Sequence, residues 1–324
     1  MKLTTEISFP PFDPRLNHSG RYALAGSCFS ENIGDWLRTL QFNAEVNTTG
    51  IAYNPSSIAG HISAALSGKA PPPEAFEISQ SRFVHCDYHS RFSGASAPEA
   101  AERINRALKL WGDALRTADV LFITFGTAVV FKQKHSGLTV NNCHKLPANL
   151  FEQVMPEESY FFDAMYNALT ALRAVNPEVK ICFTVSPVRH LRHGAVTNAR
   201  SKARLIRLCE MLCGAFENTL YLPVYEYVID ELRDYRFYRH DDLIHLNEAG
   251  LQMLRERLLD TLIDPACRPL LEKIEKLRRM NGHHLVRSET RESRDFILNR
   301  RRLSEEVEKE LGRKIVEMNH SQPS

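Results

Sequence analysis

A carboxylate and an imidazole lie three residues apart in the C-terminal third of the chain. Asp242 precedes His245 between an aromatic and charged run, residues 235–240, and a run that opens a helix, residues 246–250. On a tight turn the carboxylate can accept a hydrogen bond from imidazole Nδ1–H, which leaves Nε2 free as a general base. Non-catalytic loops also contain such pairs, so the pattern predicts catalysis only beside a nucleophile.

Two nucleophilic side chains lie near the N-terminus. Ser27 and Cys28 follow Gly26, where an apolar run gives way to a helical pattern. The N–H groups and dipole of a helix N-terminus favour a thiolate or a developing oxyanion. Cys28 is the better nucleophile at neutral pH, and Ser27 would need His245 as an obligatory base. We favour Cys28 and keep Ser27 open. The non-catalytic interpretation is a turn of small residues with a buried cysteine.

Donors for an oxyanion follow a second apolar run. Gly126 ends that run, and Asn142 lies further along, two residues before His144. A glycine N–H and an asparagine amide are the donors that acyl transfer requires. The alternatives are a plain strand end at Gly126 and an Asx turn at Asn142. We expect His144 to be structural or to orient substrate, because it and its neighbour Cys143 point to opposite sides of an extended segment.

Basic residues follow a third apolar run. Arg189 and His190 come just after it, and Ser201 and Lys202 lie where the next helix opens. At the edge of a sheet they could bind a carboxylate or phosphate group of a substrate. A solvated loop with a helix cap is the alternative.

The elements that must position these residues alternate along the chain. Apolar runs predict buried strands at residues 22–25, 120–125, 179–185 and 219–224, and helical spacing covers residues 31–40, 98–115, 160–175 and 198–216. This alternation predicts an α/β fold with a parallel sheet covered by helices on both faces. Ligands bind beyond the C-terminal strand ends of such sheets. Gly26, Gly126 and Ser186 should therefore lie along one rim.

Two segments depart from this alternation. Residues 41–97 show helical spacing only at 55–66 and a hairpin pattern at 76–92, and we interpret them as a cap-like insertion in a main domain of residues 1–267. Residues 268–324 hold 14 Lys and Arg against 10 Asp and Glu and no strand pattern. They predict a charged helical tail that could mediate oligomerisation. Nucleic-acid binding is an unlikely role, because acids interleave the bases.

Composition limits the possible classes of protein. The 324 residues are 43% apolar and 25% charged, with a formal net charge of +2, which excludes a disordered or fibrous protein and a chain-wide field for nucleic acid or membrane. No apolar run approaches the roughly 20 residues of a membrane span. Residues 1–6 hold an acid, and prolines follow at positions 10, 11 and 14 without an apolar region, so we expect no secretory signal and a cytoplasmic location. Seven scattered cysteines without CxxC spacing argue against disulfides and structural zinc.

Taken together, the motifs resemble the GSCFA family, in the clan of SGNH (GDSL-like) hydrolases. The resemblance runs in the family's order over roughly residues 20–265, and Ser30 stands where the family prefers alanine. The matching blocks are residues 26–34, 124–128, 142–145, 186–190, 201–203 and 242–245.

The clan resemblance implies a flavodoxin-like α/β/α sandwich and ester or acyl chemistry on a carbohydrate or small acyl substrate. Asp242 and His245 match the clan's Asp-x-x-His acid and base. A gap-free alignment with Gly-Asp-Ser puts Ser27 at the aspartate and Cys28 at the nucleophilic serine, and a slip of one residue would make Ser27 the nucleophile.

The oxyanion block matches the clan less closely. Gly126 matches the oxyanion glycine, but Ala128 stands where the clan usually has asparagine. Asn142 is the candidate replacement, on proximity in sequence alone.

The sequence thus predicts an acyl-ester hydrolase or acyltransferase that needs no cofactor or metal. Cys28 or Ser27 attacks, His245 is base and then acid, Asp242 orients His245, and Gly126 with Asn142 stabilises the oxyanion. The expected partner is a small-molecule or glycan ester. The alternative is a catalytically silent module of the same fold that binds a glycan or a protein.

Overall fold

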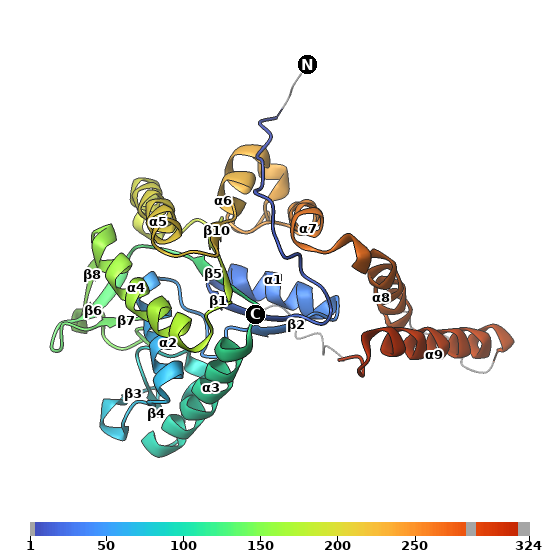
Figure 1. Cartoon of the computed structure of the whole chain (residues 1–324). Coiled ribbons are helices and arrows are strands. Elements are labelled where there is room, and N and C mark those ends of the chain that lie inside the picture. The colour runs from blue at the N-terminus through green and yellow to red at the C-terminus, as the bar shows by residue number, and fades with distance from the viewer. Residues whose placement is uncertain (1–3, 283–289, 317–324) are drawn as a thin grey trace.

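A five-stranded parallel sheet forms the centre of the molecule in the computed structural model, which describes residues 4–282 and 290–316 (Figure 1). The strand order is β10-β9-β5-β1-β2. The strands are β1 (Arg21–Gly26), β2 (Asn43–Val46), β5 (Val120–Phe125), β9 (Lys180–Val185) and β10 (Thr219–Tyr221), and every neighbouring pair is parallel.

Helices cover both faces of the sheet, which confirms the predicted three-layer α/β/α sandwich. One face carries α2 (Pro55–Ser67), α3 (Ala97–Thr117), α4 (Glu158–Val175) and α5 (Ala195–Ala215). The other carries α1 (Cys28–Thr39), α6 (Val224–Glu226) and α7 (Glu248–Leu262), with α8 (Arg268–Asn281) beyond them.

The central strand β5 shows why the apolar runs predicted the sheet. All six of its residues are buried. Leu121, Ile123 and Phe125 belong to the core under α2–α5, whereas Val120 and Phe122 belong to the core under α1 and α7. Because successive strand residues point to opposite faces, a strand covered on both sides is apolar at nearly every position, and Thr124 is the one polar residue of β5.

Residues 41–97 were predicted to be an insertion that caps the sheet, but part of this segment belongs to the main fold. Its strand β2 pairs with β1 at the edge of the sheet, and its helix α2 packs in the main core. Only four residues long and exposed at alternate positions, β2 gives too weak a pattern to predict. The predicted hairpin is present as β3 (Glu77–Ser79) and β4 (Arg82–Val84).

A second small sheet was not predicted. Its order is β7-β6-β8, and all of its pairs are antiparallel. The strands are β6 (Val130–Gln133), β7 (Thr139–Val140) and β8 (Phe151–Val154). They lie between β5 and α4, where the sequence showed only a connection.

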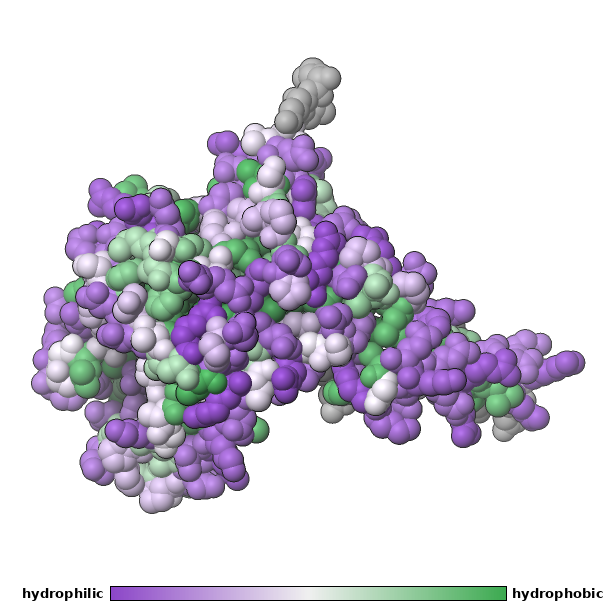
Figure 2. Space-filling view, viewed as in Figure 1, coloured by the Kyte–Doolittle hydropathy of each residue, from purple (hydrophilic) through white to green (hydrophobic). Residues whose placement is uncertain are grey.

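The tail is helical, as predicted, and extends from one side of the molecule as α8 followed by α9 (Arg291–Leu311) (Figure 1). Its surface is mainly hydrophilic in the view of Figure 2. Three hydrogen bonds attach the segment after α9 to the α1–β2 turn. Val316 N–H donates to Gln41 Oε1 at 2.9 Å, Gln41 Nε2 donates to the Val316 carbonyl at 3.1 Å, and the Arg313 guanidinium donates to the Gln41 carbonyl. Oligomerisation through the tail stays a prediction. In the described part of the chain, no helix combines the length and apolarity needed to cross a bilayer.

Gly26, the last residue of β1, has a backbone conformation and surroundings that require glycine. Its φ is +139°, and an added Cβ would lie 2.2 Å from the Thr124 carbonyl oxygen. We predict that Gly26→Ala lowers the free energy of unfolding by about 1–3 kcal/mol, the typical cost of such backbone strain. Urea denaturation measures this.

The matched control is Gly60→Ala in α2, because a Cβ there would meet nothing within 4 Å. This control should stabilise the protein by about 0.5–1 kcal/mol. Equal stability of the two variants would contradict the assigned role of Gly26.

Candidate active site

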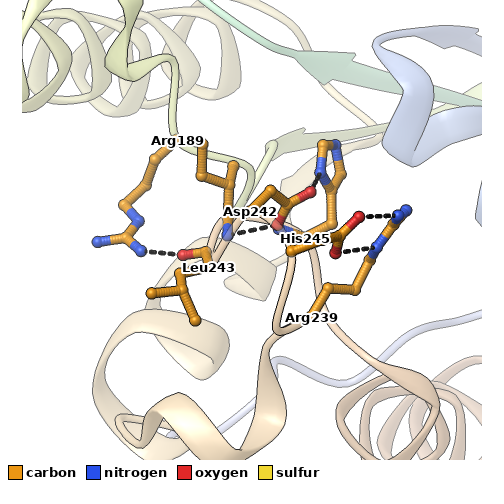
Figure 3. Close-up of polar contacts among 7 residues, drawn as sticks. Arg189, Arg239, Asp242, Leu243 and His245 are labelled. Carbon is orange, nitrogen blue, oxygen red and sulfur yellow. Dashed lines mark hydrogen bonds and ion pairs between the residues drawn. The ribbon is translucent and has the colours of Figure 1, made fainter.

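The turn before α7 holds Asp242 and His245 in the geometry that their spacing predicted. Asp242 Oδ2 and His245 Nδ1 lie 2.7 Å apart, and Asp242 Oδ1 accepts the N–H groups of Ile244 at 2.7 Å and His245 at 3.0 Å (Figure 3). Burial alone would raise the pKa of Asp242, but these hydrogen bonds outweigh it and lower the pKa to about 2. Within the described residues no protein group bonds His245 Nε2, and 42% of the side chain is exposed. This nitrogen is free to act as a base.

Arg189 connects this turn to the end of β9. Its guanidinium donates to the Leu243 carbonyl (Figure 3) and lies over the rings of Tyr235 and Tyr238, 5.9 and 5.5 Å from their centroids. Leu243 has a φ of +54°, an uncommon value for a branched residue, so the turn needs such support. Arg189 was predicted to bind an anionic substrate group, but its observed partner is the protein.

At the β1–α1 junction, Ser27 and Cys28 are in different situations. Ser27 is the N-cap of α1: its side chain is 1% exposed, and its Oγ accepts the Phe29 N–H at 3.3 Å. Cys28 is the first residue of the helix and is partly exposed. Burial and the nearby Glu31 charge raise the pKa of the Cys28 thiol, although the N–H groups of Phe29 and Cys28 act in the opposite direction. The resting side chain is therefore a thiol at the N-terminal end of the helix.

Gly126 lies beside this junction. A Cβ on Gly126 would be 3.3 Å from Ser27 Cβ, so the ends of β1 and β5 share one rim as expected. However, the N–H groups of Gly126 and Thr127 both donate to the Tyr53 carbonyl, at 2.7 and 3.0 Å. Gly126 can therefore stabilise an oxyanion only after its N–H leaves that carbonyl, and its predicted role stays a prediction.

Lys202 joins the ends of β5 and β9 from beneath the rim. Its Nζ donates to the carbonyls of Gly126 and Ser186, both at 2.7 Å, and the side chain is 1% exposed. Burial lowers the pKa of Lys202 to about 7, although nearby Cys28 opposes the shift. The preceding residue, Ser201, accepts the Ala128 N–H at 2.7 Å. Both residues therefore organise the rim and do not project from it as anion ligands.

Comparison with known proteins identifies the family of the chain. The model of the GSCFA family matches residues 21–257, which include the β1–α1 junction, the rim and the Asp242–His245 turn. The chain belongs to the GSCFA family. Among curated proteins, no sequence match was found. One solved structure, provisionally named as a platelet activating factor from Streptococcus pneumonia, matches with 13% identity and a TM-score of 0.40, covering 75% of this chain and 84% of that one. So low a score carries no inference about function.

Two rings of the GSCFA chain connect the nucleophile side of the site to the base side. The rings of Tyr53 and His190 meet edge to face with centroids 5.6 Å apart. Burial lowers the pKa of His190 to about 4, and the charges of Lys202 and His245 add to this, so His190 is neutral at pH 7. Burial also raises the pKa of Tyr53, with a further contribution from Cys28. Sequence analysis missed Tyr53, whose only signal is its place just before the Asn54 cap of α2.

Asn142 and His144 bind the hairpin segment. Asn142 Oδ1 accepts the His144 N–H at 2.8 Å, and its own N–H donates to the Cys86 carbonyl at 2.7 Å. The buried His144 ring bonds the His85 carbonyl through Nε2 at 2.9 Å. Within the described ranges neither residue hydrogen-bonds to Cys28 or the Gly126 turn. Asn142, which was predicted from proximity in sequence to stabilise the oxyanion, instead hydrogen-bonds to His144 and Cys86.

The neighbouring Asn141 reaches closer to the site. Its Nδ2 donates to the Ile51 carbonyl at 2.8 Å, on the loop that leads to Tyr53. Its Oδ1 is buried and has no hydrogen-bond partner in the described part of the chain. The amide thus supports the loop whose Tyr53 carbonyl holds the Gly126 N–H.

Cys28 and His245 do not share a hydrogen bond in the described part of the chain; Tyr53 and His190 connect them. Catalytic hydrogen bonds are often long in ligand-free sites and shorten when substrate binds. The structure places the thiol at the start of α1 and the base on the turn before α7.

The Arg189 contact gives a first test of the site. We predict that Arg189→Gln speeds amide hydrogen exchange at residues 242–245, because the Leu243 carbonyl loses its donor. Global stability should change little. Arg192→Gln, an exposed arginine of the same loop, is the control and should leave the exchange unchanged. Equal exchange in the Arg189→Gln and wild-type proteins would contradict the support of the turn by Arg189.

The thiol gives a second test, which needs no substrate. Because the Glu31 charge raises the pKa of Cys28, Glu31→Gln should lower it and increase the thiolate fraction at pH 8. Alkylation by iodoacetamide should then be faster, by roughly threefold if the thiol pKa falls by one, since the less basic thiolate is also less nucleophilic. Mass spectrometry of the Cys28 peptide follows the rate. Asp35→Asn, on the next turn of α1, is the control, and a slower rate in Glu31→Gln would contradict the electrostatics.

Proposed function

We propose that this GSCFA protein is an acyl-ester hydrolase or acyltransferase with Cys28 as its nucleophile. The observation that carries the proposal is the 2.7 Å contact between Asp242 and His245, fixed by two further hydrogen bonds to the Asp242 carboxylate. This pair fixes the tautomer of His245 with Nε2 unprotonated. Such a pair beside a helix-end thiol is the arrangement that acyl transfer requires.

The reaction proceeds in two halves. His245 Nε2 takes the proton of the Cys28 thiol, and the sulfur attacks the acyl carbon, so that an S–C bond forms and the carbonyl oxygen becomes an oxyanion. The oxyanion collapses, the C–O bond to the leaving group breaks, and the imidazolium returns its proton to that oxygen. Water or an acceptor hydroxyl then attacks the acyl-enzyme, with His245 again as base and then acid. Hydrolysis and transfer differ only in this acceptor.

The α1 N-terminus supplies the first stabilisation of the oxyanion. The Cys28 N–H already faces the thiol region, whereas the Phe29 N–H also donates to Ser27 Oγ. The Gly126 N–H adds a second donor when the Tyr53 carbonyl moves away. A single such donor is worth about 2.7–4 kcal/mol of barrier.

Ser27 is the weaker candidate for the nucleophile. Its hydroxyl caps α1 and is 1% exposed, so attack would cost the helix cap as well as the burial of the side chain. We therefore place Ser27 as the residue that presents Cys28.

For the substrate, we propose an ester of a glycan or another small hydroxyl-bearing molecule. Aromatic rings lie at both ends of the site, with Tyr53 beside the thiol and Tyr235 beside Arg189. Tyr235 is 62% exposed and can pack against the apolar face of a sugar.

A catalytically silent binding module is the second candidate, and three observations favour it. The Gly126 N–H is occupied, burial keeps the Cys28 thiol protonated, and Cys28 and His245 share no hydrogen bond within the described residues. Such a module would bind a glycan at the same rim without turnover.

Turnover of p-nitrophenyl acetate distinguishes the candidates. We predict that Cys28→Ala and His245→Ala each lower kcat/KM by at least about 100-fold, the usual contribution of such groups. Ser27→Ala should keep most of the activity and lower stability by about 1 kcal/mol through loss of the cap. Cys213→Ala, another partly exposed cysteine, is the matched control.

Three results decide among the alternatives. Full activity in Cys28→Ala with none in Ser27→Ala would move the nucleophile to Ser27. No activity in wild-type protein, with glycan binding retained in His245→Ala, would leave the binding module. Equal loss in Cys213→Ala would show that the assay reports stability and not chemistry.

A further inference from the structure

Lys202 is a buried lysine whose ammonium lies at the ends of two central strands of the sheet. It lies on α5, is 1% exposed, and places its ammonium between the carbonyls that end β5 and β9. In the described part of the chain it forms no ion pair with a carboxylate. Its other neighbours are the Tyr225 ring on α6, with Nζ 5.9 Å from the centroid, and the side chains of Cys28 and His190.

Packing alone does not explain a lysine at this position. A buried ammonium without a carboxylate costs more free energy than an apolar side chain of the same length. The residue is stable there because its donors fit two carbonyls at 2.7 Å. The fold thus holds a titratable cation near the proposed nucleophile.

The carbonyls of Gly126 and Ser186 belong to the two turns that follow β5 and β9. The Gly126 carbonyl and the Thr127 N–H belong to one peptide unit: Lys202 binds one side and the Tyr53 carbonyl binds the other. Ser186 is the residue at which β9 turns toward Arg189. Lys202 therefore fixes the orientation of the candidate oxyanion turn and of the loop that supports His245.

The charge of Lys202 lies near the thiol, because Nζ donates to the Gly126 carbonyl at 2.7 Å and a Cβ on Gly126 would lie 3.3 Å from Ser27 Cβ, next to Cys28 in the chain. The ammonium favours the thiolate of Cys28, and the thiolate in turn favours the ammonium. Glu31 on α1 opposes this effect, and His190 is neutral. Lys202 is the nearby cation that favours ionisation of Cys28.

We propose that Lys202 is a positioning residue that holds the ends of β5 and β9 together and supplies the positive charge that stabilises the thiolate of Cys28. The first part stands on the hydrogen bonds alone. The second part rests on the proposed function only because that function makes the thiolate the attacking group. No bond is made or broken at Lys202.

The test is the pH profile of Cys28 alkylation by iodoacetamide between pH 6 and 10. Lys202→Met removes the charge and keeps the length, so the profile should move to higher pH. The rate at pH 7.5 should fall about threefold or more, since a nearby charge shifts a pKa by one or more and the more basic thiolate is also more nucleophilic. Lys202→Arg keeps a charge and should restore most of the wild-type profile. Lys180→Met, at the other end of β9, is the control and should not move it.

A second measurement covers the case in which Lys202→Met does not fold. In wild-type protein labelled with ¹³C at lysine Cε, one resonance that is absent from Lys202→Arg should titrate with a midpoint near 7. A Lys202 side chain that is already uncharged at pH 6 would overturn the proposal, as would an unchanged alkylation profile in folded Lys202→Met.

The two proposals fail separately. An unchanged profile in an active esterase would remove the role of Lys202 and leave the acyl chemistry. A shifted profile in a protein without esterase activity would keep the role of Lys202 in thiolate stabilisation and remove the catalytic use of the thiolate.

Discussion

The parallel pairing of β1, β5 and β9 is the constraint on which the site depends. Gly26 pairs with Thr124, and Thr124 pairs in turn with Thr184, so the three strands run in the same direction and end almost level. Whatever follows each strand must then emerge on the same edge. The helix-end thiol follows β1, the Gly126 turn follows β5, and the loop with Arg189 follows β9. No single segment contains the site, and the sheet assembles it.

The Asp242–His245 turn is the exception, because it follows no strand of this row directly. It lies before α7, and its position depends on the guanidinium of Arg189 and on the left-handed conformation of Leu243. One side of the site is thus as rigid as the sheet, and the other is a turn supported by a few hydrogen bonds. A substrate that closes the distance between Cys28 and His245 would move the turn and leave the strands in place.

Sequence analysis predicted the features that depend on local interactions and missed those that depend on contacts between distant residues. The strands were predicted because burial on both faces demands continuous apolar runs, as in β5. The Asp242–His245 geometry was predicted because it is closed by its own backbone within three residues. The partner of Arg189 lies 54 residues away, so no local pattern could indicate it. For the same reason, the Tyr53 carbonyl that occupies the Gly126 N–H was not foreseen, and Asn141 reaches the Tyr53 loop where Asn142 was expected at the site.

The central claim is that the sulfur of Cys28 becomes acylated with the help of His245. The most direct measurement is rapid acid quenching during turnover of p-nitrophenyl acetate, followed by mass spectrometric location of the acetyl group. We predict an acetyl adduct on the peptide that contains Cys28, formed at least about 100 times faster than in His245→Ala. An adduct on Ser27, or one on Cys28 that forms equally fast without the imidazole, would contradict the claim.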